Sequence, residues 1–254
     1  MNNLESINER GVSRRDINWQ GVDWQDIDWR ALWIKREQRR NVPDSADKWN
    51  IRADEHAQRS SLSTYAQTFL EYLAIEPGQS VLDVGCGWGT LAIPLAQAGH
   101  DVIAIDFAQR MLEVVETRMQ TEHVAGITTR LLNWNDDWAA AGIAEKSVDV
   151  AIASRSTIVF DMWEALEKLD RTARNRVAIT TATEFTPRMF KPLGKPSDDQ
   201  DFFIPDHIYC INMLLRMGVY PELRYIDSIK PDTDGTMRLT RWAWISWKPL
   251  HDGA

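Results

Sequence analysis

The chain has 254 residues, of which 44% are hydrophobic and 26% charged, which suits one α/β domain with additions and a substantial core. Its net charge of −8 gives no overall basic surface, so neither nucleic acid nor a membrane is expected as a partner. Two cysteines and five scattered histidines indicate neither a disulfide framework nor a metal site. No stretch approaches the roughly 20 apolar residues of a membrane span. The first 15 residues are polar, so a cytoplasmic location is expected.

Residues 1–47 are expected to form an N-terminal arm before a main domain at 48–254. A five-residue unit recurs in the arm and places Trp19, Trp24 and Trp29 at equal spacing. A period of five fits neither helix nor strand, so short turns are predicted there, followed by a basic helix at 31–40. Two interpretations stay open. The tryptophans pack on the main domain or on a second subunit, as in a homo-oligomer joined by the arm, or they cap a ligand pocket with apolar walls that also hold cations.

The next segment, 61–75, predicts a helix with one face packed against a sheet. Its apolar side chains recur at helical spacing, and they are Leu62, Tyr65, Ala66, Phe69, Leu70 and Leu73. We expect most of this stripe to be core.

A buried strand predicted at 81–84 runs directly into three glycines at alternate positions, Gly85, Gly87 and Gly89, before an apolar helical run at 91–98. Glycines allow a ligand to approach the main chain closely. The N–H groups of such a turn, together with the dipole of the following helix, favour an anionic ligand group. The turn therefore predicts a nucleotide-type binding site.

A second acid strengthens this prediction. The strand predicted at 101–106 ends in Asp106, 23 residues after Asp83. In a right-handed β-α-β unit the two strands lie side by side, so Asp106 should arrive beside the glycine turn and could accept both hydroxyls of a ribose.

An acid before G-x-G-x-G, with a second acid at the end of the next strand, resembles the class I S-adenosylmethionine (SAM)-dependent methyltransferases. The dinucleotide fingerprint has a different spacing, G-x-G-x-x-G. The resemblance covers about residues 48–248. It implies SAM as cofactor and a Rossmann-like α/β fold, a doubly wound, mostly parallel seven-stranded sheet that ends in an antiparallel hairpin.

The resemblance also implies which residues hold the cofactor. These are the motif residues Asp83, Gly85, Cys86, Gly87 and Gly89, the ribose acid Asp106, the adenine walls Phe107 and Met111, and Asn133, Trp134 and Ser154 at later strand ends. Asn133 stands where the family has an acid that accepts from the adenine amino group, and Asp136 is its alternative. The segment 49–53 resembles one that folds over the cofactor, although a structural role for Trp49 and Arg52 is equally expected.

The remaining pattern predicts strands at 127–132, 147–153 and 176–181, and a helix opened by a capping box at Asp161. An irregular segment at 183–204 reads as an inserted loop on the substrate side. A helix then starts at Pro205, with Ile208, Ile211, Asn212 and Leu215 on one face. The last strands, 219–229 and 237–247, flank Asp234-Gly235, which signals a hairpin.

Candidate catalytic residues follow the later strands. Ligands of open α/β sheets bind beyond the carboxyl ends of the strands, so Arg155 could pair with a substrate carboxylate or phosphate, with a structural ion pair as the alternative. A general base would be needed only for a hydroxyl or a protonated amine. The candidates are His207, Glu184 and Asp161, each with a structural role as the alternative.

The leading hypothesis is methyl transfer from SAM to a small-molecule acceptor, since the segments expected around the pocket are aromatic and the chain is acidic. Trp88 in Gly-Cys-Gly-Trp-Gly resembles the cyclopropane fatty acid synthases but does not select that branch. One alternative is a non-catalytic SAM-binding partner subunit that uses the arm as its interface. The other is a nicotinamide-dependent oxidoreductase, which the glycine spacing disfavours.

Overall fold

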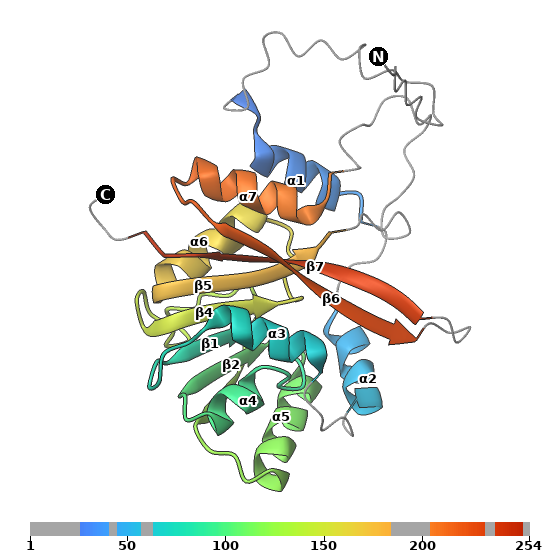
Figure 1. The fold of residues 1–254 in the computed structure, drawn as a ribbon, viewed down its shortest axis with the longest axis vertical. Helices are drawn as coiled ribbons and strands as arrows, with labels where there is room; N and C mark the ends of the chain where they lie inside the picture. The colour runs from blue at the N-terminus through green and yellow to red at the C-terminus, as the bar shows by residue number, and fades with distance from the viewer. Residues whose placement is uncertain (1–25, 41–44, 57–62, 184–203, 232–236, 251–254) are drawn as a thin grey trace, which may run out of the picture.

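A computed structural model describes residues 26–40, 45–56, 63–183, 204–231 and 237–250, as a sheet with helices on both faces (Figure 1). Trp19, Trp24, the inserted loop from 184 to 203 and the Asp234-Gly235 turn lie outside these residues. Within the described part, no helix has the length and apolar character needed to cross a membrane.

The sheet has seven strands in the order β3-β2-β1-β4-β5-β7-β6, which confirms the predicted fold class. The first five strands in this order are mutually parallel, and β7 is inserted antiparallel between β5 and β6. The strands are β1 (Val81–Val84), β2 (Val102–Asp106), β3 (Ile127–Leu131), β4 (Val148–Ser154), β5 (Ala173–Ala182), β6 (Glu222–Pro231) and β7 (Met237–Trp247).

Strand β1 lies where the strand order reverses, with β2 on one side and β4 on the other. All four of its residues are buried, because helices cover both faces of the sheet here. Its last residue, Val84, is level with Ile105 of β2, and Asp83 is level with Ile152 of β4. The carboxyl ends of β1, β2 and β4 therefore meet at one edge, where ligands of open α/β sheets bind.

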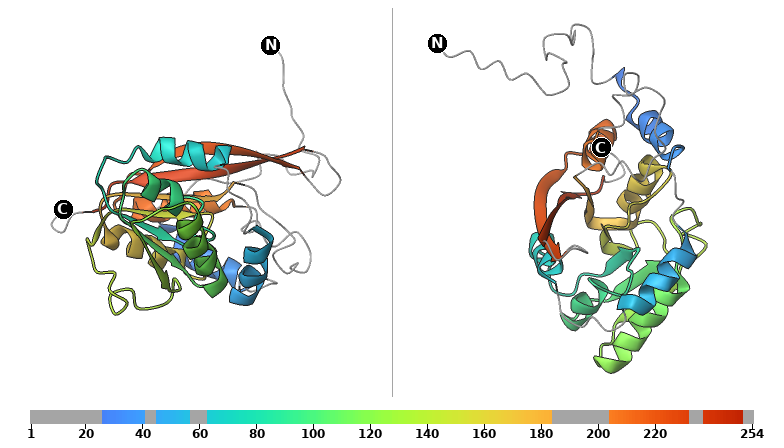
Figure 2. Two further views of the ribbon diagram at one scale, coloured as in Figure 1. Left: turned by 90° about the horizontal axis from the view of Figure 1, so that it is seen from below. Right: turned by 90° about the vertical axis from the view of Figure 1, so that its right-hand side faces the viewer.

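The helices form two layers (Figure 2). One face of the sheet carries α3 (Thr64–Leu73), α4 (Ala92–Gln97) and α5 (Gln109–Thr121), and the other carries α1 (Trp29–Glu37), α6 (Met162–Thr172) and α7 (Asp206–Arg216). The remaining helix, α2 (Ala46–His56), packs against α5. Tyr65, Ala66, Phe69 and Leu73 of α3 are buried, as the apolar stripe predicted.

The predicted helix is present as α7, but the side chains that it buries are not the four that share its predicted face. Ile208, Ile211, Asn212 and Leu215 are only half-buried, and the buried side chains are His207, Tyr209, Cys210, Met213 and Leu214. Both sets recur at helical spacing and both are largely apolar, so periodicity alone did not select between them. The choice follows from tertiary packing, because α7 lies between the sheet and α1.

Helix α1 packs into the core of the main domain. Trp33 is 1% exposed, and its indole Nε1–H donates to the carbonyl oxygen of Val159 at 3.1 Å. Trp29, the one described tryptophan of the repeat, meets the Tyr209 ring edge-on at 5.9 Å between centroids. For Trp29 the structure thus bears out packing on the main domain. The predicted basic helix is present, and its Arg36 is buried.

Candidate functional site

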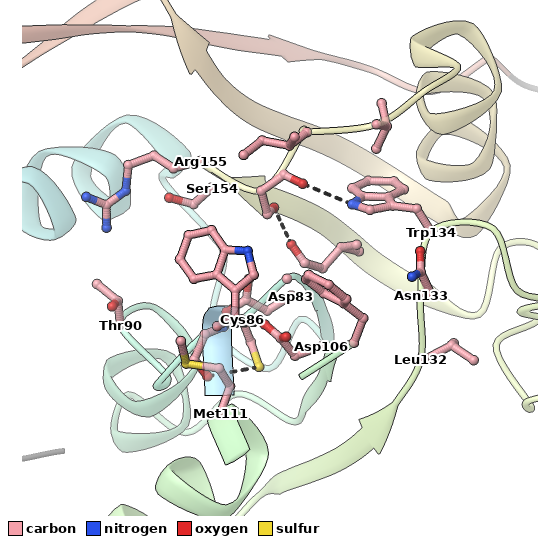
Figure 3. A pocket seen from close by; sticks show the side chains of 18 of the residues that line it. Asp83, Cys86, Thr90, Asp106, Met111, Leu132, Asn133, Trp134, Ser154 and Arg155 are labelled. Carbon is pink, nitrogen blue, oxygen red and sulfur yellow. Dashed lines mark hydrogen bonds between the residues drawn. The ribbon is translucent and has the colours of Figure 1, made fainter. Parts of the chain in front are cut away.

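A cavity of about 710 Å³ opens at the carboxyl ends of the central strands (Figure 3). Residues from β1, the glycine turn, β2 and the segments after β3 and β4 line it, together with α2 and β7. Of the sequence-predicted site residues it brings together Asp83, Gly85, Cys86, Gly87, Asp106, Phe107, Met111, Asn133, Trp134, Ser154 and Arg155. Gly89 and His207 are not in its lining.

The glycine turn is shaped by its backbone. Gly85, Gly87 and Gly89 all have positive φ, at 68°, 55° and 77°, a region in which side-chain-bearing residues are strained. A Cβ at Gly85 would collide with the side chain of Ser156, whereas a Cβ at Gly87 would meet no protein atom within 4 Å. Gly85 is therefore required for packing. Gly87 leaves a bare stretch of main chain at the cavity.

Two acids stand beside the turn. The Asp106 carboxylate accepts the backbone N–H of Gly87 and that of Ala108, each at 2.9 Å, and these bonds fix its orientation. A carboxylate oxygen has more than one acceptor site, so a group of this kind is suited to hydroxyl-bearing ligands. Asp83 is 2% exposed, and its burial and the charge of Asp106 raise its pKa to about 7. The two acids give this part of the cavity an affinity for a cationic or hydroxyl-bearing ligand.

The wall beyond β3 differs in detail from the family pattern. The Asn133 backbone N–H donates to Asp136 Oδ2 at 2.8 Å, so Asp136 closes a turn, and it does not line the cavity. Asn133 lines the cavity in its place. The Trp134 indole donates to the carbonyl oxygen of Ser156 at 3.0 Å, which ties the segment after β3 to the one after β4.

Arg155 follows β4 with an unusual backbone φ of +57°. Its N–H donates to Thr180 Oγ1 at 3.0 Å, and its guanidinium lies 4.1 Å from the centroid of the Tyr65 ring. Tyr65 is in turn held by hydrogen bonds to Ser154 Oγ at 2.7 Å and Thr180 Oγ1 at 2.6 Å. Burial raises the pKa of Tyr65, so its phenol stays neutral at pH 7.

Two of the three candidate bases, His207 and Asp161, do not line the cavity. His207 packs its ring against Tyr225 with 6.1 Å between centroids, and burial lowers its pKa. Asp161 caps α6 and binds the Arg30 guanidinium, with its Oδ2 2.6 Å from Nη2. Glu184 lies outside the described residues. For Asp161 the contacts fit the structural alternative.

Sequence reasoning missed two aromatic residues of this region. Tyr65 is buried, as its helical stripe predicts, but its polar contacts are not predicted, and the signal for them is a hydroxyl within an otherwise apolar stripe. Trp242 of β7 lines the cavity, although the sequence predicts only a hairpin strand there. Neither residue is near the glycine motif in sequence, and only the folded sheet brings them there.

Comparison with known proteins agrees with this geometry. Residues 81–176 match a family model described as a methyltransferase domain. Over 186 residues the chain is 33% identical to an uncharacterized protein of Haemophilus influenzae, covering 71% of this chain and 66% of that protein. It is also 48% identical over 56 residues to demethylmenaquinone methyltransferase of Renibacterium salmoninarum, covering 22% of this chain and 24% of that enzyme. The chain thus spans no more than about two thirds of the length of either relative.

A solved structure gives the same fold. A SAM-dependent methyltransferase from Aquifex aeolicus superposes on this chain with a TM-score of 0.55 at 14% identity. The superposition covers 82% of this chain and 100% of that one. Residues 81–176 are thus a methyltransferase domain, and the strand order is that of the fold of the class I SAM-dependent methyltransferases. SAM is the cofactor of this class.

Proposed function

We propose that this protein transfers a methyl group from SAM to a small-molecule acceptor. The observation that carries the proposal is the pairing of Gly87 with Asp106. A bare backbone position faces the cavity, and the carboxylate beside it is held in place by the turn itself. A ligand can approach that backbone while its hydroxyls bond to the acid.

The lining residues fit SAM along its length. Asp106 would accept from the ribose hydroxyls, with Phe107 and Met111 against the adenine and Asn133 at the adenine edge. Asp83 is buried next to Asp106 and would face the cationic part of the molecule. A cation there would favour the ionised form of Asp83 and so offset the cost of its burial.

SAM, when bound, supplies a methyl group on a positively charged sulfur that is already a good leaving group. The protein then has to align the acceptor with that methyl group and to exclude water from the site. Alignment of this kind contributes up to about 7–11 kcal/mol in favourable cases. Trp88, Trp134 and Trp242 line the cavity with rigid apolar surface suited to both tasks.

Two features support a small acceptor. The volume of about 710 Å³ falls in the range of about 300–1,000 Å³ that is typical of small-molecule sites. The net charge of −8 disfavours a nucleic acid, which needs a basic surface.

The test has two stages. Calorimetry should detect SAM binding to the full chain, and Gly87→Val should abolish it. Methyl-labelled SAM is then incubated with the protein and a metabolite extract, and transfer of label to a small molecule is expected. Transfer to no molecule, with SAM binding intact and a stable complex with another protein, would overturn the proposal in favour of a non-catalytic partner subunit.

A further inference from the structure

Arg155 stands out among the charged residues of the cavity. Its guanidinium is stacked over Tyr65 at 4.1 Å and lies 5.8 Å from the Trp242 ring centroid. Among the described residues no carboxylate pairs with it, and its only hydrogen bonds are those of its backbone N–H to Thr180. A cation that lines a cavity without a counter-ion is a binding group for an anionic ligand.

The position of this cation is fixed by its surroundings. Left-handed backbone geometry is uncommon for arginine and is retained where neighbouring contacts impose it. Here Thr180, which is fully buried, receives the Arg155 N–H, and the Tyr65 ring beneath the guanidinium is bonded to both Ser154 and Thr180. Stacking on a ring face leaves the N–H donors, which lie in the guanidinium plane, available at its edge.

The charged side chains that the central strands carry to the cavity change sign along the strand order, and the lining has a second cation, Arg52, from α2. Asn133 follows β3, Asp106 ends β2, and Asp83 lies one residue before the end of β1. This stretch is the one that fits the cofactor. Arg155 lies one strand further on, at β4, beside Trp242 of β7. Figure 3 shows its side chain on the far side of Ser154 from Asn133. The Arg155 guanidinium therefore lies beyond Asp106 and Asp83, on the side of the cavity that remains for the acceptor.

We infer that the acceptor is a small molecule bearing a carboxylate or a phosphate, and that Arg155 binds this anion. The inference rests on the proposed function. A planar guanidinium offers two parallel N–H donors to either anion, which fixes orientation as well as position. Arg155 is thus a substrate-binding residue that holds the acceptor by a group other than the one that is methylated.

SAM itself carries a carboxylate, which is a second source of an anion for Arg155. Arg155→Met separates the two. If the acceptor supplies the anion, Arg155→Met should bind SAM within about twofold of wild type, while transfer to the acceptor falls roughly 10- to 100-fold, since bonds to a charged group are lost. Arg155→Lys should recover part of the transfer. A loss of SAM affinity of tenfold or more would assign Arg155 to the cofactor and overturn the inference.

A matched control is Arg224→Met. Arg224 also stacks on a tyrosine, with its guanidinium 4.9 Å from the Tyr72 ring centroid, but it does not line the cavity. It should leave both SAM binding and transfer unchanged. In the extract assay, the acceptor should be retained by an anion-exchange resin at neutral pH. An acceptor in the unretained fraction would contradict the inference.

A binding experiment without turnover keeps the inference separate from the proposed function. Arginine Nε–H signals of the chain saturated with S-adenosylhomocysteine are followed by NMR during titration with inorganic phosphate and with benzoate. One signal should shift, and Arg155→Met should remove that signal. No shift with either anion would overturn the anion site. A shift together with no methyl transfer to any fraction would leave the anion site standing and remove the enzymatic proposal.

Discussion

Asp106 holds the glycine turn through Gly87, whose N–H lies 2.9 Å from Asp106 Oδ2. The acid predicted from the sequence as a ribose ligand therefore also fixes the backbone that a ligand would approach. Its second oxygen accepts the N–H of Ala108, so the carboxylate links the turn after β1 to the start of α5.

Asp106→Ala should weaken SAM binding by roughly 1–3 kcal/mol, because hydrogen bonds to a charged group are lost. The turn also loses its anchor, so the free energy of unfolding should fall. Calorimetry and urea denaturation measure the two effects. Asp101→Asn is the control, since Asp101 is exposed at the opposite end of β2. Equal SAM affinity in Asp106→Ala and wild type would contradict the ribose assignment.

Three glycine variants separate binding from folding. Gly87→Ala and Gly99→Ala both place a Cβ in free space at positive φ, so each should lose about 1–2 kcal/mol of stability from backbone strain. Of these two glycines only Gly87 lines the cavity, so SAM binding should be lost in Gly87→Ala and retained in Gly99→Ala. Gly85→Ala should fold poorly, because its methyl group meets Ser156. Normal SAM affinity in Gly87→Ala would show that no ligand contacts the turn.

The pKa of about 7 at Asp83, raised by burial and by Asp106 from an ordinary 3.8, gives a pH dependence with a definite sign. Between about pH 4 and 7 the folded protein retains a proton that the unfolded chain has released. The free energy of unfolding therefore falls as pH rises through this window. Urea denaturation of the ligand-free protein should show this slope, and Asp83→Asn should flatten it. An unchanged slope in Asp83→Asn would exclude this residue as its source.

The same acid should couple SAM binding to pH. A cation beside Asp83 favours the carboxylate, so affinity should rise with pH up to about 7, by at most roughly tenfold per unit. Calorimetry at pH 6 in two buffers of different ionisation enthalpy should detect a proton released on binding. Proton uptake, or none, would place the cationic part of SAM elsewhere.

Trp33 tests whether α1 belongs to the folded unit. Trp33→Ala should lower the free energy of unfolding by roughly 3–5 kcal/mol, because it leaves a cavity in the core and removes the hydrogen bond to Val159. Gln38→Ala, at an exposed position that ends the same helix, should change it little. Urea denaturation of both variants decides the matter. A small effect of Trp33→Ala would mean that the helix is an appendage.

The sequence by itself determined the sheet and the side of the cavity formed by the glycine turn and its two acids. Apolar runs such as 81–84 form strands wherever both faces are covered. The glycines and the two acids belong to one β-α-β motif, and its fixed handedness allows only one relative placement of the turn and the acids. The direction of the last strand followed from the family resemblance, and pairing of β7 with β5 and β6 confirms it.

Only the tertiary structure decided which aromatic side chains surround Arg155. Tyr65 and Trp242 belong to α3 and β7, and their meeting beside Arg155 depends on how a helix and an antiparallel strand pack on the sheet. The same holds for α7, where two apolar faces competed and contact with α1 selected one. Local spacing shows which residues share a face of a helix or strand. Which face is buried, and which residues it contacts, depends on segments far apart in the chain, and no short-range pattern encodes those contacts.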